Sequence, residues 1–342
     1  MKTIQNGQEI AAYSVEASER LFSADGQEIR EGWTTDIYFV KTRQILRHLN
    51  LDRSLVTAEI FARRNGILAG VDEVKNLLKD CGVEVWALPE GSSFAEKEVL
   101  MRITGAYDDF GLFETPILGM LASSSGWATA SRECKEAAGD KLMICFGARH
   151  VHPAVAPVME RAAVIGGADG CSCILGAKLL KREPSGTVPH TVFLVVGDSV
   201  KVAQSYQELI GEPVIVLVDT FKDEIEESLR VAEALGQHLN AVRLDTPSER
   251  GGVTPALVRE ARARLDQAGY SHVQILVSGG LTPDRIRILS EAGAASFGVG
   301  SYISGASAID MTMDLKEVNG LPLAKRGRIP GITPNEHLER IL

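Results

Sequence analysis

The chain has 342 residues with a mean hydropathy near zero, 45% hydrophobic and 24% charged residues, and a net charge of −9 at pH 7. That balance is typical of a globular protein of one large or two ordinary domains, and it excludes the broad basic surface that binds nucleic acid. We expect no secretory signal and no membrane partner, because the first twenty residues are polar and no apolar stretch is long enough to cross a bilayer. Five cysteines without a Cys-x-x-Cys pair favour a reduced, cytoplasmic setting.

Residues 1–116 are predicted to form an α+β sandwich domain. Strand patterns with intervening turns favour antiparallel pairing, and helical patterns lie between them. A helical stretch beginning at Gly111 leads towards the next domain. We expect the weakly patterned tail, 306–342, to return to this first domain. The predicted strands lie at 55–62, 83–91 and 98–110, and the predicted helices at 34–49 and 72–80.

Residues 117–305 repeat an apolar strand, a polar or glycine turn and an amphipathic helix. The strands are continuous apolar runs, as expected where helices cover both faces of a parallel sheet. About seven such units predict an irregular parallel α/β barrel of the TIM-barrel type, which we expect to be the catalytic domain. The predicted strands are 141–147, 170–176, 190–197, 213–219, 241–245, 273–279 and 295–300, and the predicted helices include 153–166, 199–211, 224–239 and 254–269.

Two successive predicted strands end in glycines. Gly279 and Gly280 follow Ser278 at the end of one strand, and Gly298 and Gly300 end the next. Exposed backbone N–H groups at such ends, with the helix N-terminus that follows, form a cradle for phosphate. The alternative is that glycine is present only for a positive φ angle. Two pairs on neighbouring strands favour the phosphate cradle.

Two aspartates stand in similar positions at strand ends. Asp219 and Asp245 each come directly before a threonine, Thr246 in the second case. Either aspartate alone is more often a helix cap or a turn residue. Together at one barrel mouth, they predict hydrogen bonds to ribose hydroxyls or contacts with Mg²⁺. Arg243 precedes Asp245 by two residues, so we expect both side chains on the same strand face.

The segment 145–153, "CFGARHVHP", places Arg149 directly after a strand. The ordinary role of such an arginine is a structural ion pair. His150 and His152 have metal-ligand spacing on a strand but no evident third ligand, so we predict no protein metal site. His190 follows a proline-containing turn, where a lone histidine is usually structural.

Ten segments in order resemble the nicotinate phosphoribosyltransferases in their short, archaeal-like form, which belong to the type II phosphoribosyltransferases. The resemblance extends from about Thr34 to Ser304. It rests on "TTDIYFVKT", "LPEGSSF", "FETPILGMLAS", "FGARHVHP", "ERAAVIGGADG", "SGTVPH", "LVDTFKDE", "VRLDTPSERGG", "VSGGL" and "FGVGSYIS".

The resemblance implies that the enzyme condenses nicotinate with phosphoribosyl pyrophosphate, coupled to ATP hydrolysis and with Mg²⁺ as cofactor. The products are nicotinate mononucleotide and pyrophosphate. It also implies a homodimer or higher homo-oligomer whose subunits pair head to tail and share active sites. Arg149 would bind the nicotinate carboxylate, Phe146 would stack on the pyridine ring, and Tyr38 of the partner subunit would cover the other ring face.

The resemblance assigns the remaining residues to the sugar, the phosphates and ATP. Asp219 and Asp245, with Arg243 and Thr246 beside them, would contact the ribose or the Mg²⁺-bound pyrophosphate. His190 would be phosphorylated by ATP. The 5-phosphate would be held by the group Ser278, Gly279, Gly280, Gly298 and Gly300.

The sequence departs from the family pattern at Cys145, where an acidic residue is frequent, and at His150, where many relatives have a second arginine. The tail has no cysteine, so we predict no structural zinc. Quinolinate and nicotinamide remain alternative substrates, although quinolinate demands a denser cationic cluster and nicotinamide does not need Arg149. A barrel aldolase or isomerase would need a base such as Lys178, and a non-catalytic homologue that binds a phosphate ligand is the last alternative.

Overall fold

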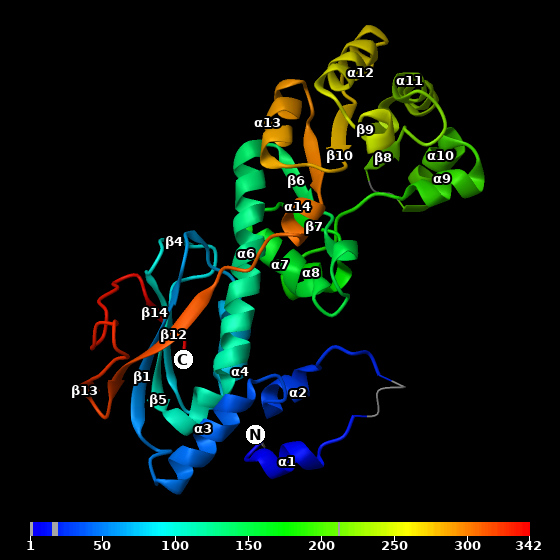
Figure 1. The fold of residues 1–342 in the computed structure, drawn as a ribbon. Helices are drawn as coiled ribbons and strands as arrows, with labels where there is room; N and C mark the ends of the chain where they lie inside the picture. Colours follow the sequence, from blue (N-terminus) through cyan, green and yellow to red (C-terminus); the bar gives the residue numbers. More distant parts are fainter. Residues whose placement is uncertain (1–2, 16–19, 211–212) are drawn as a thin grey trace. The chain divides into compact units, whose positions relative to one another are not determined.

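A computed structural model describes residues 3–15, 20–210 and 213–342. The chain divides into two compact units, one formed by Met1–Thr129 with Ser307–Leu342 and the other by Ala130–Ala306. Each unit contains one main sheet (Figure 1). Helix α6 (Glu114–Ala138) continues from the first range into the second.

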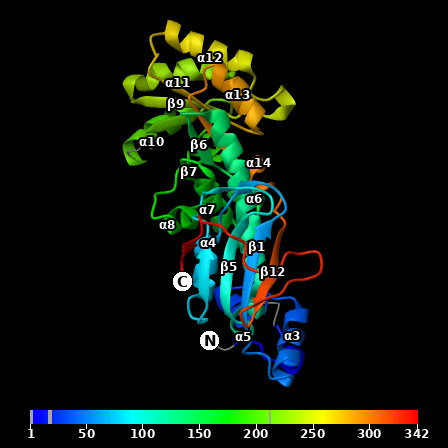
Figure 2. The same ribbon diagram turned by 90° about the vertical axis from the view of Figure 1, so that its left-hand side faces the viewer.

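The first unit contains an antiparallel six-stranded sheet in the order β13-β12-β1-β5-β3-β14. Its central strand β1 pairs with β5 on one side and with β12, from the C-terminal tail, on the other (Figure 2). Alternate β1 residues Ala58 and Ile60 are buried in the core, whereas Glu59 on the opposite face pairs with Arg102 of β5. The strands are β1 (Leu55–Ala62), β3 (Glu84–Ala87), β5 (Val99–Ala106), β12 (Met311–Val318), β13 (Leu321–Pro322) and β14 (Glu339–Arg340), with a separate hairpin of β2 (Gly66–Ile67) and β4 (Ser93–Phe94).

Helices pack on the apolar face of this sheet. Helix α4 (Val71–Leu78) buries its apolar stripe, including Val74 and Leu77, and the start of α6 adds Ile117 and Leu121 to the same core. This spacing of three and four residues is the signature of an amphipathic helix. The other helices are α1 (Gly7–Ala12), α2 (Gly26–Glu31), α3 (Ile37–His48), α5 (Tyr107–Phe110) and the 3₁₀ turn Gly111–Phe113.

The second unit contains a curled, parallel half-barrel sheet in the order β7-β6-β11-β10-β9-β8. Strands β7 and β8 are its edges, so the described sheet is open between them. The expected parallel α/β sheet is therefore confirmed, but with six strands in place of about seven. The strands are β6 (Leu142–Cys145), β7 (Gly170–Cys171), β8 (Val214–Leu217), β9 (Leu239–Leu244), β10 (Gln274–Ser278) and β11 (Ser296–Val299).

The predicted strand at 190–197 is wrong, because His190–Val196 forms helix α9. Pro189 precedes it with a φ of −81° and occupies the helix N-cap. A short apolar run, here the five residues Val192–Val196, does not distinguish a buried strand from a helix by periodicity. Here Leu194 and Val195 are 62% and 81% exposed, so burial on two sheet faces does not explain their apolar character. The predicted strand 170–176 is also too long, because helix α8 begins at Ile174.

Helices follow the strands around the outside of the curled sheet, and α10 to α13 pack against one another in sequence (Figures 1 and 2). Thr254 and Thr282 cap α12 and α13, and each is followed by a proline at the first helical position. The predicted helix 199–211 ends at Ile210, and its residue 211 lies outside the described residues. These helices are α7 (Ala156–Gly166), α8 (Ile174–Leu179), α10 (Ser199–Ile210), α11 (Glu224–Leu235), α12 (Pro255–Gln267), α13 (Pro283–Glu291) and α14 (Ser301–Ser304).

In the part of the chain that the structure describes, no helix combines the length and the apolar character needed to cross a bilayer.

Candidate active site

Arg243 organises the carboxyl-terminal mouth of the half-barrel. Its Nε donates to Ser278 Oγ at 2.8 Å, its Nη1 to Thr187 Oγ1 at 2.8 Å, and its Nη2 to Asp245 Oδ2 at 3.2 Å. The prediction that Arg243 and Asp245 share a strand face is confirmed. Burial lowers the pKa of Arg243, and the Asp245 carboxylate opposes that effect. One guanidinium thus joins three segments that are far apart in the sequence.

Phe146 follows β6 and lies beneath the same guanidinium. The Arg243 Cζ is 5.2 Å from the ring centroid, which is cation–π geometry. A Cβ atom at Gly298 would lie 2.4 Å from Phe146 Cε2, and one at Gly300 would lie 2.9 Å from His150 Cε1. Glycine is therefore needed at 298 and 300 because aromatic side chains approach the backbone closely.

The other glycine pair is needed for a different reason. Gly279 and Gly280 have φ angles of +90° and +58°, which L-residues with side chains rarely adopt. Ser278 Oγ donates to Asp245 Oδ1 at 2.8 Å, and a Cβ at Gly279 would lie 3.0 Å from the same oxygen. The turn after β10 therefore bends closely around the Asp245 carboxylate.

Asp219 is a buried carboxylate just beyond the end of β8. Its side chain is 2% exposed, and neither oxygen has a hydrogen-bond partner among the described residues. Burial raises its pKa, and His190 acts in the opposite direction. A buried, unpartnered carboxylate is costly unless a cation or a hydroxyl donor reaches it. The Asp219 carboxylate oxygens can therefore bind Mg²⁺ or accept hydrogen bonds from ribose hydroxyls.

His190, at the first turn of α9, brings the two aspartates together. Its Nε2 lies 3.9 Å from Asp219 Oδ2 and 3.7 Å from Asp245 Oδ2, and its Nδ1 lies 3.0 Å from Thr220 Oγ1. The side chain is 38% exposed, so part of the ring faces solvent. The structure thus assembles His190, Asp219 and Asp245 into one cluster.

Arg149 lies in the 3₁₀ turn Ala148–His150 and is exposed. Its Nε is 3.4 Å from His150 Nε2, and His150 Nδ1 is 3.1 Å from Ser304 Oγ. His150 therefore contacts α14, the short helix that follows β11. No three histidine, cysteine, aspartate or glutamate side chains of the described ranges are arranged to hold a metal ion.

Two predicted residues have other surroundings. Thr246 is buried, and its hydroxyl donates to Glu224 Oε1 at 2.8 Å, which attaches the end of β9 to the start of α11. Tyr38 lies on α3 in the other unit and is 54% exposed. Burial and the nearby Glu114 carboxylate raise the pKa of Tyr38.

Sequence reasoning missed Thr187 and Glu160. Glu160 on α7 is fully buried, and its Oε1 accepts hydrogen bonds at 3.0 Å from both the Ala148 N–H and the Ser172 hydroxyl. Its Oε2 accepts from the Cys173 N–H. A single carboxylate in a helix that is apolar apart from the neighbouring Arg161 was the available signal for Glu160. Thr187 had none, because its partner Arg243 is 56 residues away.

Comparison with known proteins identifies the family. Residues 36–125 match the N-terminal domain of quinolinate phosphoribosyl transferase, and residues 127–314 match its C-terminal domain. The crystal structure of nicotinate-nucleotide pyrophosphorylase from Pyrococcus furiosus is 44% identical, with a TM-score of 0.87 over 92% of this chain and 82% of that chain.

More distant relatives carry nicotinate phosphoribosyltransferase names. The Mycobacterium tuberculosis protein pncB1 is 29% identical over 69% of this chain and 54% of that protein, so this chain spans about half of its length. The human nicotinic acid phosphoribosyltransferase structure is 19% identical with a TM-score of 0.70, covers 87% of this chain and 77% of that chain, and shows the fold alone. The motifs indicated the nicotinate enzymes in particular, whereas the matches establish the broader family. The chain belongs to the quinolinate phosphoribosyl transferase family.

Proposed function

We propose that the protein transfers 5-phosphoribosyl from phosphoribosyl pyrophosphate to nicotinate, which gives nicotinate mononucleotide and pyrophosphate for NAD synthesis. The observation that carries this proposal is the buried Asp219 carboxylate, whose oxygens have no hydrogen-bond partner among the described residues, beside Asp245 at the barrel mouth. Sugar hydroxyls and a divalent cation are the ligands that such a pair lacks.

The chemistry needs positioning and charge stabilisation more than proton transfer. The pyridine nitrogen has a lone pair and needs no general base before it attacks the ribose. As pyrophosphate leaves, positive charge develops on the sugar, and the carboxylates of Asp219 and Asp245 stabilise it. Mg²⁺, when bound with the substrate, neutralises charge on the leaving group, and the same two aspartates would hold it.

The turn after β10 supports 5-phosphate binding. Gly279 and Gly280 adopt left-handed conformations directly before the Thr282-capped N-terminus of α13. A helix N-terminus carries a partial positive charge, and a glycine turn lets a phosphate approach the backbone. Gly298 and Gly300 contribute to the site by giving space to Phe146 and His150.

Arg149 supports nicotinate as the acceptor. Its guanidinium lies on an exposed turn and acts electrostatically on Arg243, which covers the Phe146 ring. A pyridine ring stacked on Phe146 would then have its carboxylate within reach of Arg149. Arg243 also lies at the mouth, but its N–H groups already donate hydrogen bonds to Asp245, Ser278 and Thr187. A single available guanidinium matches a monocarboxylate better than a dicarboxylate.

Quinolinate is the second candidate acceptor, with release of CO₂. It is favoured by the 44% identity to the Pyrococcus furiosus nicotinate-nucleotide pyrophosphorylase. A second cationic group would then have to come from another subunit. We propose that the enzyme is a cytoplasmic homodimer or higher homo-oligomer in which Tyr38 of the partner subunit covers the pyridine ring.

We further propose that ATP phosphorylates His190. The imidazole is partly exposed and stands beside both aspartates, so a phosphate on its ring would change the charge at the mouth directly. Such a change couples ATP cleavage to substrate affinity through two enzyme states.

The test is pyrophosphate release from phosphoribosyl pyrophosphate with nicotinate, nicotinamide or quinolinate, each with and without ATP. The proposal predicts release with nicotinate, increased by ATP, and little with nicotinamide. Release of CO₂ with quinolinate at a higher kcat/KM would establish the second candidate. No release with any of the three would refute a phosphoribosyltransferase.

A further inference from the structure

Glu160 is a fully buried carboxylate of α7 that joins two separate segments of the half-barrel. Its Oε1 accepts hydrogen bonds from the Ala148 N–H and the Ser172 hydroxyl, both at 3.0 Å. Its Oε2 accepts from the Cys173 N–H. Ala148 belongs to the turn that carries Arg149, whereas the other two donors directly follow β7. One side chain thus fixes the arginine turn to the segment after β7.

The ends of the arginine turn have anchors of their own. The Phe146 N–H donates to a carbonyl oxygen of β11 at 2.7 Å, and His150 Nδ1 lies 3.1 Å from a hydroxyl of α14. Between these ends, the bond from Ala148 to Glu160 holds the backbone directly before Arg149. The Arg149 side chain is exposed, so its direction depends on this backbone more than on packing.

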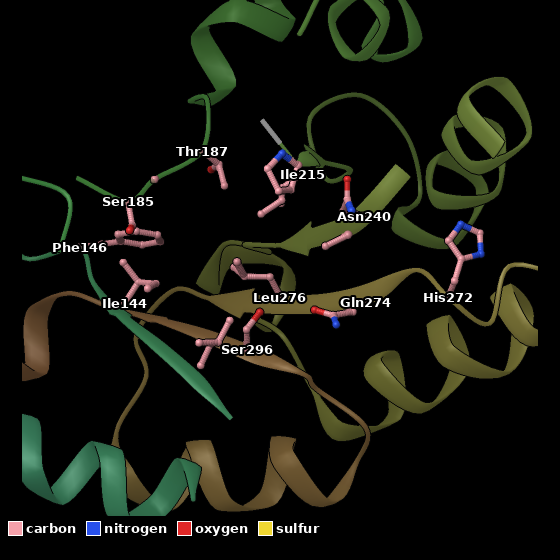
Figure 3. Close-up of a pocket in the computed structure, with 14 residues that line it drawn as sticks. Ile144, Phe146, Ser185, Thr187, Ile215, Asn240, His272, Gln274, Leu276 and Ser296 are labelled. Carbon is pink, nitrogen blue, oxygen red and sulfur yellow. The ribbon is translucent and has the colours of Figure 1, made fainter. Parts of the chain in front are cut away.

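The segment after β7 also borders the ring on which the pyridine is proposed to stack. The Ser185 N–H donates to Cys171 O, the last carbonyl of β7, at 2.8 Å. Figure 3 shows Ser185 and Phe146 at the same end of the space within the curled sheet. Glu160 therefore ties the turn that carries Arg149 to the chain segment that flanks the ring.

We propose that Glu160 is a positioning residue, which sets the direction of Arg149 and thereby the affinity for the nicotinate carboxylate. This inference rests on the proposed function, which places Arg149 at that carboxylate, and it names the group that holds the arginine in place. Glu160 acts from outside the substrate site, because its buried oxygens accept from three protein donors. A guanidinium binds a carboxylate through two parallel hydrogen bonds, so a small rotation of the turn weakens the pair.

Glu160→Gln removes the double acceptor and keeps the shape of the side chain. A carboxylate accepts hydrogen bonds on both oxygens, whereas an amide accepts on its oxygen and donates from its nitrogen. In either orientation of the amide, the Ala148 N–H or the Cys173 N–H faces another N–H group, and the link between the two segments is lost. Steady-state kinetics should show a rise of about tenfold in the KM for nicotinate, with less than about a twofold change in the KM for phosphoribosyl pyrophosphate.

A double-variant cycle tests whether Glu160 acts through Arg149. In an Arg149→Ala background, Glu160→Gln should change the KM for nicotinate by less than about twofold, because residues that act through one contact are not additive. The matched control is Glu227→Gln, which replaces a buried glutamate of α11 that is bonded to Arg230, and it should leave the KM for nicotinate nearly unchanged. The same rise in both backgrounds, or an equal rise in the control, would overturn the proposal.

Amide hydrogen exchange, followed by mass spectrometry, reports on the turn without any substrate. Exchange in a peptide that covers residues 146–150 should be at least about fivefold faster in Glu160→Gln, and exchange in α12 should stay as in the wild type. If Glu160→Gln does not fold, Glu160→Asp takes its place, because it withdraws both oxygens by one methylene group.

These measurements separate the two proposals. A wild type that does not use nicotinate refutes the proposed function. A wild type that uses nicotinate, together with unchanged exchange or an unchanged KM for nicotinate in the folded Glu160 variant, overturns the positioning role alone.

Discussion

The Arg243 guanidinium lies over the Phe146 ring, with 5.2 Å between Cζ and the ring centroid. Because the same guanidinium also holds Ser278, Thr187 and Asp245, the ring and the acidic cluster share one support. A cation–π pair of this kind contributes about 0.5–2 kcal/mol. The positions of the Phe146 ring and the Asp245 carboxylate are therefore linked, and a substitution that moves one should move the other.

Gly298→Ala should raise the KM for nicotinate about fivefold or more. The added methyl group would lie 2.4 Å from Phe146 Cε2, so the ring must move and its stacking on the substrate, worth ~1 kcal/mol, is lost. Steady-state kinetics with each substrate varied in turn give the measurement. Gly119→Ala, where a Cβ meets nothing within 4 Å, is the matched control. An unchanged KM in Gly298→Ala would show that Phe146 does not stack on the pyridine ring.

Arg149→Ala should raise the KM for nicotinate at least tenfold and leave the KM for phosphoribosyl pyrophosphate nearly unchanged. Arg149 is exposed in the free protein, and truncating one member of an arginine–carboxylate pair that becomes desolvated on substrate binding costs about 2–5 kcal/mol. Arg259→Ala, on an exposed face of α12, is the control for the loss of a surface arginine. Equal effects on both substrates would remove Arg149 from its assigned role.

Asp219→Asn should stabilise the protein at neutral pH by about 1 kcal/mol or more, because a buried carboxylate without hydrogen-bond partners is destabilising. The pKa of Asp219 is raised by folding, so the folded state holds a proton that the unfolded state releases at about pH 4. Below the unfolded-state pKa, Asp219 is protonated in both states and does not lower the stability of the wild type. As the pH rises through the raised pKa of Asp219 in the folded state, the buried carboxylate becomes charged and the wild type loses stability.

Thermal unfolding between pH 4 and pH 7 tests this expectation. The gap in Tm between Asp219→Asn and the wild type should widen as the pH rises. Asp266→Asn, which removes a half-exposed carboxylate on α12, should show no such widening. A constant gap, or a less stable Asp219→Asn protein at pH 7, would contradict the assignment of Asp219 as a buried carboxylate that lacks hydrogen-bond partners.

His190→Ala should abolish acid-labile incorporation of phosphate from γ-labelled ATP. The ring is partly exposed at the mouth, whereas His238, in an exposed 3₁₀ turn, precedes β9 and lies at the opposite end of that strand from Asp245. His238→Ala should therefore retain the label. Equal labelling of the wild type and His190→Ala would show that another residue carries the phosphate. No labelling of the wild type would show that ATP does not phosphorylate the protein.

The sequence predicted those elements whose pattern is unambiguous. The strands β6 and β8 to β11 are apolar runs bounded by polar or glycine turns, and the amphipathic pattern of 254–269 predicted α12. The run from His190 failed, because a short apolar segment fits a strand and a helix equally and only its exposed side chains distinguish them.

The site was partly predictable for a related reason. Arg243 and Asp245 are two residues apart, so strand periodicity alone places them on one face. The Arg243 contact with Thr187 and the Glu160 contact with Ala148 depend on tertiary packing, which leaves no local pattern. Thr246 shows that a local pattern can also mislead. Its position beside Asp245 predicted a substrate contact, but its hydroxyl donates a hydrogen bond to Glu224.

Calorimetric titration of phosphoribosyl pyrophosphate in the presence of Mg²⁺ tests the central claim most directly, namely that the acidic cluster at the half-barrel mouth seats a phosphorylated sugar. The wild type should bind one molecule per chain. Asp219→Asn, expected to be folded and more stable than the wild type, should bind it at least tenfold more weakly. The same affinity in both proteins, or no binding to the wild type, would contradict the account.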